Sequence, residues 1–153
     1  MINVPIYAQR DTRWGNNKLG FSNYLLKDKG CLVTALASFV SSVYQQNITP
    51  DLTNNKLKAA GAFSGGLLYW SKVPTAFPKF KWVKRVRGYN NAEVSTYVYT
   101  KKIPVLVEVN AWSIGAPIHW VLFLGDRKMM DPWAGSIQST AKYPPTGYAL
   151  YQT

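Results

Sequence analysis

The sequence is poor in the residues that bind metals or form disulfide bonds. Its 153 residues include one cysteine and one histidine. A single cysteine cannot form a disulfide bond within the chain, so the fold has to be stable in reducing and oxidising surroundings alike. One cysteine and one histidine also leave no ligand cluster with the spacing of a zinc site. We therefore expect neither a metal ion nor a cofactor.

Long apolar runs are missing too. A membrane-spanning helix needs about 20 consecutive apolar residues, whereas the apolar stretch 32–44 is short and is interrupted by threonine and serine. The opening MINVPIYAQRDTRWG lacks the basic segment followed by an apolar one that marks a secretory signal peptide. We expect a soluble protein that is cytoplasmic, associated with a virion or exported by another route.

Acidic side chains are scarce: seven Asp and Glu stand against 18 Lys and Arg, which gives a net charge of +11. Such a charge favours anionic surroundings such as nucleic acid, bacterial wall polymers or an acidic partner. The densest basic run, KFKWVKRVR at 79–87, alternates apolar and basic residues. This alternation predicts a strand with one solvated face, and we expect no specific binding of nucleic acid.

What the chain has in quantity is material for a core, with 47% hydrophobic and 14% aromatic residues. No repeat or linker divides it, so we predict a single domain over residues 1–153. The stretch 29–46 predicts a buried helix, because its apolar residues cover nearly every face. Thr49 and Pro50 indicate the start of a second helix that ends at Gly61.

Two further helices are expected at 65–73 and at 90–102, the latter with Asn91 as its N-cap. From Ile103 onward, short β-rich runs separated by proline and glycine predict antiparallel strands. N-terminal helices packed on a C-terminal antiparallel sheet define an α+β fold, and we expect the helices to lie on one side of that sheet.

Cys31 lies where the predicted buried helix begins. The free backbone N–H groups and the positive end of the helix dipole stabilise a thiolate at this position. Gly30, directly before it, either leaves room for a substrate backbone or serves only as a turn residue. Because a lone cysteine is more often an inert core residue, a nucleophile at this position needs chemical partners elsewhere in the chain.

His119 and Asp131 are the candidate partners. His119 opens an alternating run after a loop that contains glycine and proline, which places it near an end of the predicted sheet. A hairpin over 121–130 would bring Asp131 back beside His119. An imidazole within reach of the thiol can act as its base, and a carboxylate can fix the imidazole tautomer.

The remaining candidates would bind substrate or stabilise charge. An oxyanion hole needs hydrogen-bond donors, for which the backbone N–H of Cys31 and the side-chain amide of Gln9 are candidates. Trp120 and Trp133 each follow closely on a proposed site residue. They can line the core, or stack on substrate in a cleft.

Four segments together resemble the C39-like cysteine peptidases, a papain-like family. They are VPIYAQRDTRWG at 4–15, KGCLVTALASFV at 29–40, HWVLFLG at 119–125 and DPWAG at 131–135, in that order along the chain. The resemblance implies a papain-like fold in a protein of bacterial or phage origin. It also implies that Gln9 belongs to the oxyanion hole, Cys31 is the nucleophile, His119 the general base and Asp131 the residue that orients the imidazole.

The sequence therefore predicts a cysteine peptidase that hydrolyses peptide bonds through an acyl-enzyme, with a peptide or protein as substrate. Two alternatives stay open. The same residues could cleave the peptide stems of bacterial cell wall or transfer the acyl group to an amine. The chain could also be an inactive binding module on the same fold.

Overall fold

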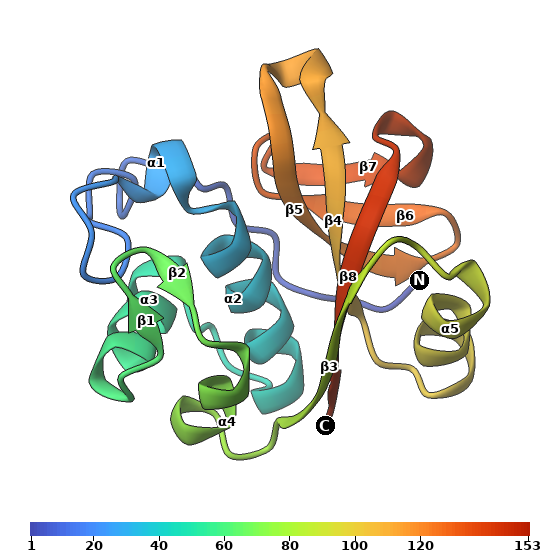
Figure 1. The fold of residues 1–153 in the computed structure, drawn as a ribbon, viewed down its shortest axis with the longest axis horizontal. Helices are drawn as coiled ribbons and strands as arrows, with labels where there is room; N and C mark the ends of the chain where they lie inside the picture. Colours follow the sequence, from blue (N-terminus) through green and yellow to red (C-terminus); the bar gives the residue numbers. More distant parts are fainter.

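The computed structural model describes all 153 residues and has a helical part beside a sheet (Figure 1). The helical part also contains a small hairpin and a turn of 3-10 helix. Its elements are α1 (Leu26–Lys29), α2 (Cys31–Tyr44), α3 (Pro50–Ala59), β1 (Phe63–Ser64), β2 (Leu67–Leu68), a 3-10 turn (Trp70–Lys72) and α4 (Val73–Ala76).

The sheet has six strands in the order β3-β8-β4-β5-β6-β7, and every neighbouring pair is antiparallel. The predicted α+β class is confirmed. The strands are β3 (Lys81–Arg87), β4 (Val105–Ala111), β5 (Ala116–Gly125), β6 (Lys128–Asp131), β7 (Ser136–Ser139) and β8 (Pro145–Gln152).

Helix α2 connects the helical part to the sheet. Every residue from 33 to 41 is buried, as its nearly continuous apolar surface predicts, and the helix packs on β5. Phe39 continues the core toward β3 through a ring contact with Phe80, whose centroid lies 4.7 Å away. At 14 residues α2 is short, and no helix of the protein is long and apolar enough to cross a membrane.

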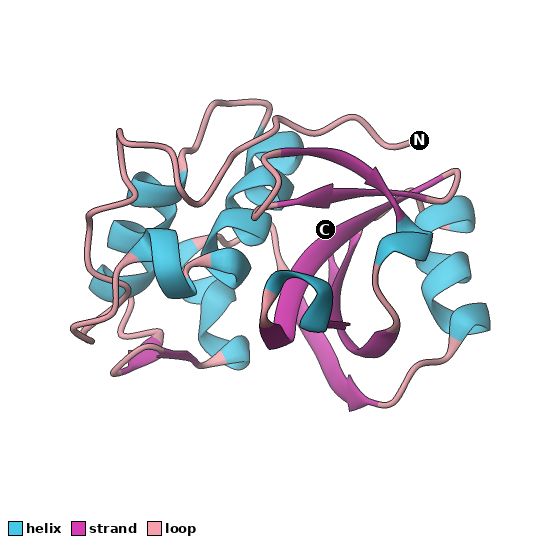
Figure 2. Ribbon diagram, turned by 90° about the horizontal axis from the view of Figure 1, so that it is seen from above, coloured by secondary structure: helices cyan, strands magenta, loops and turns pink.

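The helix predicted at 90–102 does not lie with the others. Helix α5 (Asn91–Ser95) and the π-helical turn that follows it (Thr96–Thr100) cover the opposite face of the sheet (Figures 1 and 2). The expectation that all helices share one side is therefore wrong. Strands β4, β5 and β8 are buried along most of their length, so both faces of the sheet need a covering layer.

Two local predictions also need correction. The stretch 65–73 contains a tight turn, strand β2 and the 3-10 turn before α4 begins at Val73, because Leu67 and Leu68 pair with β1 in a hairpin whose turn holds Gly65 at a positive φ of 57°. The N-cap of α5 is Asn90, one residue earlier than expected, and its side chain accepts a hydrogen bond from the backbone N–H of Glu93. By contrast, α3 begins at Pro50 as predicted.

Candidate active site

The hairpin of β5 and β6 brings His119 and Asp131 together. Leu122 pairs with Met130 in this ladder. Continued by one residue, the register sets Asp131 opposite Val121, and His119 is then a diagonal neighbour on the same face. The turn closes with positive φ at both residues 126 and 127, the geometry of a two-residue hairpin loop, and a bulge between Phe123 and Gly125 shifts the register by one residue before the Phe123–Met129 pair.

The imidazole of His119 is buried, and its Nε2 lies 2.8 Å from Oδ1 of Asp131. Because Nε2–H donates to the carboxylate, Nδ1 is the ring nitrogen left for another partner. Cys31, the first residue of α2, lines the same cleft as His119 and contributes to the raised pKa of the ring. The structure therefore joins His119 to Asp131 by a hydrogen bond and places Cys31 on the cleft that His119 also lines.

The electrostatics of the site favour a charged imidazole. Burial alone would lower the pKa of His119, but the hydrogen bonds and negative charges of Asp131 and Cys31 outweigh it and raise the pKa to about 9. Burial likewise opposes ionisation of Asp131, yet its hydrogen bonds hold the pKa of this carboxyl well below the usual value. An imidazolium and a carboxylate therefore coexist in the folded protein at neutral pH.

Asp131 is fully buried and accepts four hydrogen bonds. Oδ1 accepts from His119 and from the backbone N–H of Trp133 at 2.9 Å, whereas Oδ2 accepts from the Tyr143 hydroxyl at 2.8 Å and from Lys142 Nζ at 3.2 Å. Burial and the nearby carboxylate raise the pKa of the Tyr143 phenol, so the hydroxyl stays a donor. Sequence reasoning missed Lys142 and Tyr143, because nothing in the stretch after β7 marks them as partners of Asp131.

Gln9 is buried beside the same site. Its Nε2 donates to the carbonyl of Lys27 at 3.1 Å, and its backbone N–H donates to the carbonyl of Pro132 at 3.0 Å, which ties the N-terminal loop to the residue after Asp131. An amide nitrogen carries a second N–H, which remains available to a ligand. The side-chain Oε1 has no hydrogen-bond partner, so the amide is not fully committed to the protein.

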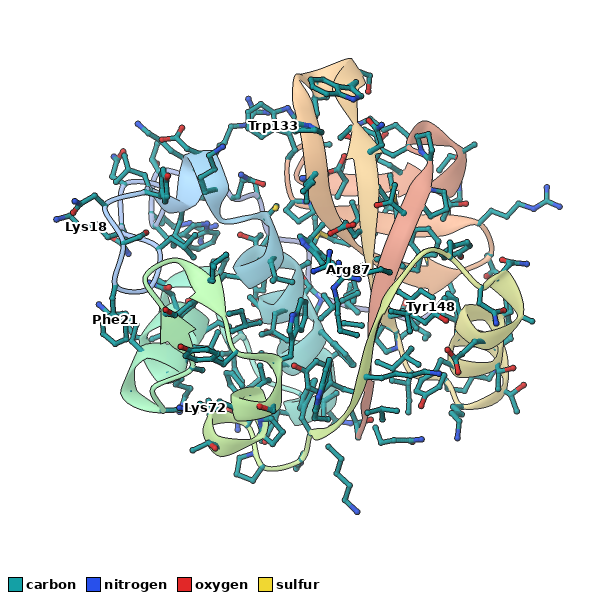
Figure 3. The ribbon with its side chains drawn as sticks, viewed as in Figure 1. Lys18, Phe21, Lys72, Arg87, Trp133 and Tyr148 are labelled. Carbon is teal, nitrogen blue, oxygen red and sulfur yellow. The ribbon has the colours of Figure 1, made fainter.

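Gln9, Cys31, His119 and Trp133 line one cleft of about 810 Å³ between the helical part and the sheet. Asp131 lies behind His119 and does not reach the cleft wall. In Figure 3, Trp133 lies near α1 at one end of this space. Another cavity, of about 230 Å³, lies beside α5 on the other face of the sheet and contains neither the thiol nor the imidazole.

The two tryptophans predicted to bind substrate differ in their contacts and in how deeply they are buried. Trp133 is fixed by Arg10, whose guanidinium lies 3.9 Å from the ring centroid and donates to the Trp133 carbonyl. Trp120 is buried against Trp70, at 5.1 Å between ring centroids, and under Arg85, at 4.8 Å. Both line the cleft, Trp133 as a half-buried wall and Trp120 as part of a packed floor.

Gly30 is placed differently from the other candidates. It is buried between α1 and α2 and is absent from the cleft wall. A Cβ at this position would lie 2.4 Å from the carbonyl oxygen of Leu26. The turn between the two helices therefore requires glycine for a structural reason, independent of any substrate.

No protein-family model, curated protein or solved structure matches the chain. No group of three or more His, Cys, Asp or Glu side chains is placed so that it could hold a metal ion. What the site can do chemically follows from its own residues: a thiol at a helix N-terminus, a buried imidazole with a raised pKa and a carboxylate that fixes the ring.

Proposed function

We propose that the protein is a cysteine peptidase of papain-like fold, resembling the C39-like peptidases, that hydrolyses peptide bonds. The observation that carries the proposal is the buried His119–Asp131 hydrogen bond of 2.8 Å beside the cleft that His119 and Cys31 both line. This is the arrangement of nucleophile, base and orienting group that thiol catalysis requires.

In the proposed reaction the thiolate of Cys31 attacks the carbonyl carbon of the scissile peptide bond. The thiol proton passes to His119, whose raised pKa of about 9 favours the imidazolium. The tetrahedral intermediate collapses as His119 gives that proton to the leaving amine, which leaves an acyl-enzyme. Water then attacks the thioester, with His119 as general base, and releases the acid and the free thiol.

The negative oxygen of the intermediate needs donors that are already oriented. The backbone N–H of Cys31 belongs to the first turn of α2, where N–H groups have no partner within the helix. Gln9 lines the same cleft, and the second N–H of its side-chain amide is the other proposed donor. A donor of this kind contributes about a hundredfold or more to turnover.

The test is the substitution Cys31→Ala, assayed by mass spectrometry of a proteome-derived peptide mixture. We expect wild-type protein to generate new peptide termini and the variant to generate none. Cys31→Ser, which keeps the shape of the side chain, is the control for folding. Undiminished cleavage by the alanine variant would overturn the proposal.

Peptide stems of bacterial cell wall are a second candidate substrate for the same residues. The net charge of +11 favours them, because wall polymers are anionic. Incubation with purified peptidoglycan, in parallel with the peptide mixture, separates the two substrates. A thiol that iodoacetamide labels no faster than a free cysteine, with no product from either substrate, would indicate a binding module.

A further inference from the structure

The cleft extends beyond the thiol and the imidazole to a charged floor on the sheet. Arg85 of β3 and Glu108 of β4 line this floor and form an ion pair with 2.8 Å between Nη2 and Oε2. The other oxygen of Glu108 accepts the hydroxyl of Thr146 at 2.9 Å. Both carboxylate oxygens therefore have a partner, and Arg85 is the cation that forms an ion pair with Glu108.

The side chain of Arg85 is fixed by its neighbours. Its guanidinium lies over the Trp120 ring, and its side chain is 16% exposed. Gly147 of the neighbouring strand makes room for it, since a Cβ there would lie 2.7 Å from Nη1 of Arg85. Arg85 is thus a fixed and neutralised part of the floor.

Arg87 is the contrasting residue. It follows Arg85 by two positions in a regular part of β3, so both side chains emerge on the same face. Arg87 is exposed, lines the cleft and has no ion pair. Burial lowers the pKa of Arg85, the charge of Glu108 raises it, and the nearby charge of Arg87 lowers it.

In Figure 3, Arg87 lies in the middle of the molecule, between the sheet and α2, farther along the space that Trp133 bounds near α1. The floor therefore carries two guanidinium groups for one carboxylate, and the unmatched charge faces the space where a substrate would lie. An arginine fork binds a carboxylate through two parallel hydrogen bonds, which gives both strength and direction.

We propose that Arg87 is the recognition group of a subsite for a carboxylate carried by the substrate. The proposal rests on the proposed function, because it assigns the cleft to a peptide. A peptide offers this group as an Asp or Glu side chain, and a cell-wall stem offers it as a free carboxyl within the stem. The chemistry at Arg87 is the same in both cases.

The experiment compares peptides that differ only by Glu or Gln at one position. A positional-scanning library with this exchange at each position is offered to the wild-type protein, and kcat/KM is measured for each pair. We expect Glu to be preferred about tenfold or more at one position, the size of a charge-assisted hydrogen bond. Stem peptides with free or amidated side carboxyls form a second arm that separates the two sources.

Two variants locate the effect. In Arg87→Gln the ratio of Glu to Gln should fall to about one, and Arg87→Lys should restore part of it as a single point charge. Lys81→Gln is the matched control, because it removes one positive charge from an exposed position of the same strand outside the cleft. The ratio should be unchanged in that variant.

Binding in the Cys31→Ala background separates this proposal from the catalytic one. Calorimetric titration of the same peptide pairs should give tighter binding of the Glu member, whether or not the wild-type protein cleaves it. Cleavage without any preference, or equal affinity of the two members, would overturn the carboxylate subsite. A binding preference without cleavage would support the subsite and contradict the peptidase.

Discussion

Replacement of Asp131 by asparagine tests whether this carboxylate holds the imidazole in its charged form. Asparagine has the same shape, and its amide oxygen can keep the bonds from His119 and Trp133 that Oδ1 accepts now. The amide nitrogen then faces Tyr143, whose hydroxyl can rotate to accept, and Lys142, which is 31% exposed and can move into solvent. The ring orientation is preserved while the negative charge is lost.

The magnitude follows from the pKa of His119. It is raised from an ordinary 6.5 to about 9 by Asp131 and Cys31 against the effect of burial, so loss of Asp131 moves it back toward 6.5. At pH 7.5 nearly all wild-type imidazole is protonated, whereas a group with a pKa of 6.5 is protonated in about one molecule in ten. We expect Asp131→Asn to lower kcat/KM by up to about tenfold at pH 7.5, and much less below pH 6.

The ring itself can be observed without any substrate. His119 is the only histidine, so its NMR signals titrate alone. Asp126→Asn is the matched control, since it removes a carboxylate from the exposed turn of the same hairpin. A titration midpoint that stays near 9 in the Asp131 variant would refute the reasoning, because the raised pKa of His119 would then not depend on the charge of Asp131.

Three further predictions concern the oxyanion hole, the turn before the thiol and the pH dependence of stability. Gln9→Ala should lower kcat by about a hundredfold or more with little change in KM, measured by steady-state kinetics; an unchanged kcat would exclude Gln9 from the oxyanion hole. Gly30→Ala should lower the free energy of unfolding by about 1–3 kcal/mol, because the new methyl group meets the Leu26 carbonyl; urea denaturation measures this, and a neutral result would contradict the close packing. The free energy of unfolding of the wild-type protein should fall, by at most about 3 kcal/mol, as pH rises from about 6.5 through 9, because the pKa of His119 is higher in the folded protein than in the unfolded chain. Denaturation curves across this range check the third prediction, and a flat profile would contradict it.

The elements with strong local patterns were predictable. The uncharged stretch 32–44 could only be a buried helix, and Pro50 begins α3 as its fixed φ favours. The closeness of His119 and Asp131 along one hairpin was also accessible, but the bulge between Phe123 and Gly125 that sets both side chains on one face was not. Periodicity and turn chemistry act over a few residues, and these features depend on nothing more distant.

The features that failed depend on contacts between segments far apart in the chain. The helix at 91–100 has a pattern that fits either side of the sheet, and only the burial of β4, β5 and β8 on both faces decides its place. The run 79–87 correctly indicated a strand, but its alternation was wrong about the faces, because Val83 is 41% exposed and Arg85 is half-buried beside Glu108. The pattern also could not distinguish Arg85 from the free Arg87. That distinction requires the strand order β3-β8-β4, which places Glu108 of β4 within reach of Arg85.

The positions of Asp131 and Cys31 relative to the imidazole therefore depend on different parts of the fold. The bond from His119 to Asp131 is set within one hairpin, whereas the approach of Cys31 depends on how α2 packs against β5. Substitutions in the buried surface of α2 can therefore change the distance between thiol and ring while leaving the other bond intact. Such a variant would keep the part of the raised His119 pKa that comes from Asp131 and lose the part that comes from Cys31. The NMR titration of His119 therefore tests the two halves of the proposed site separately.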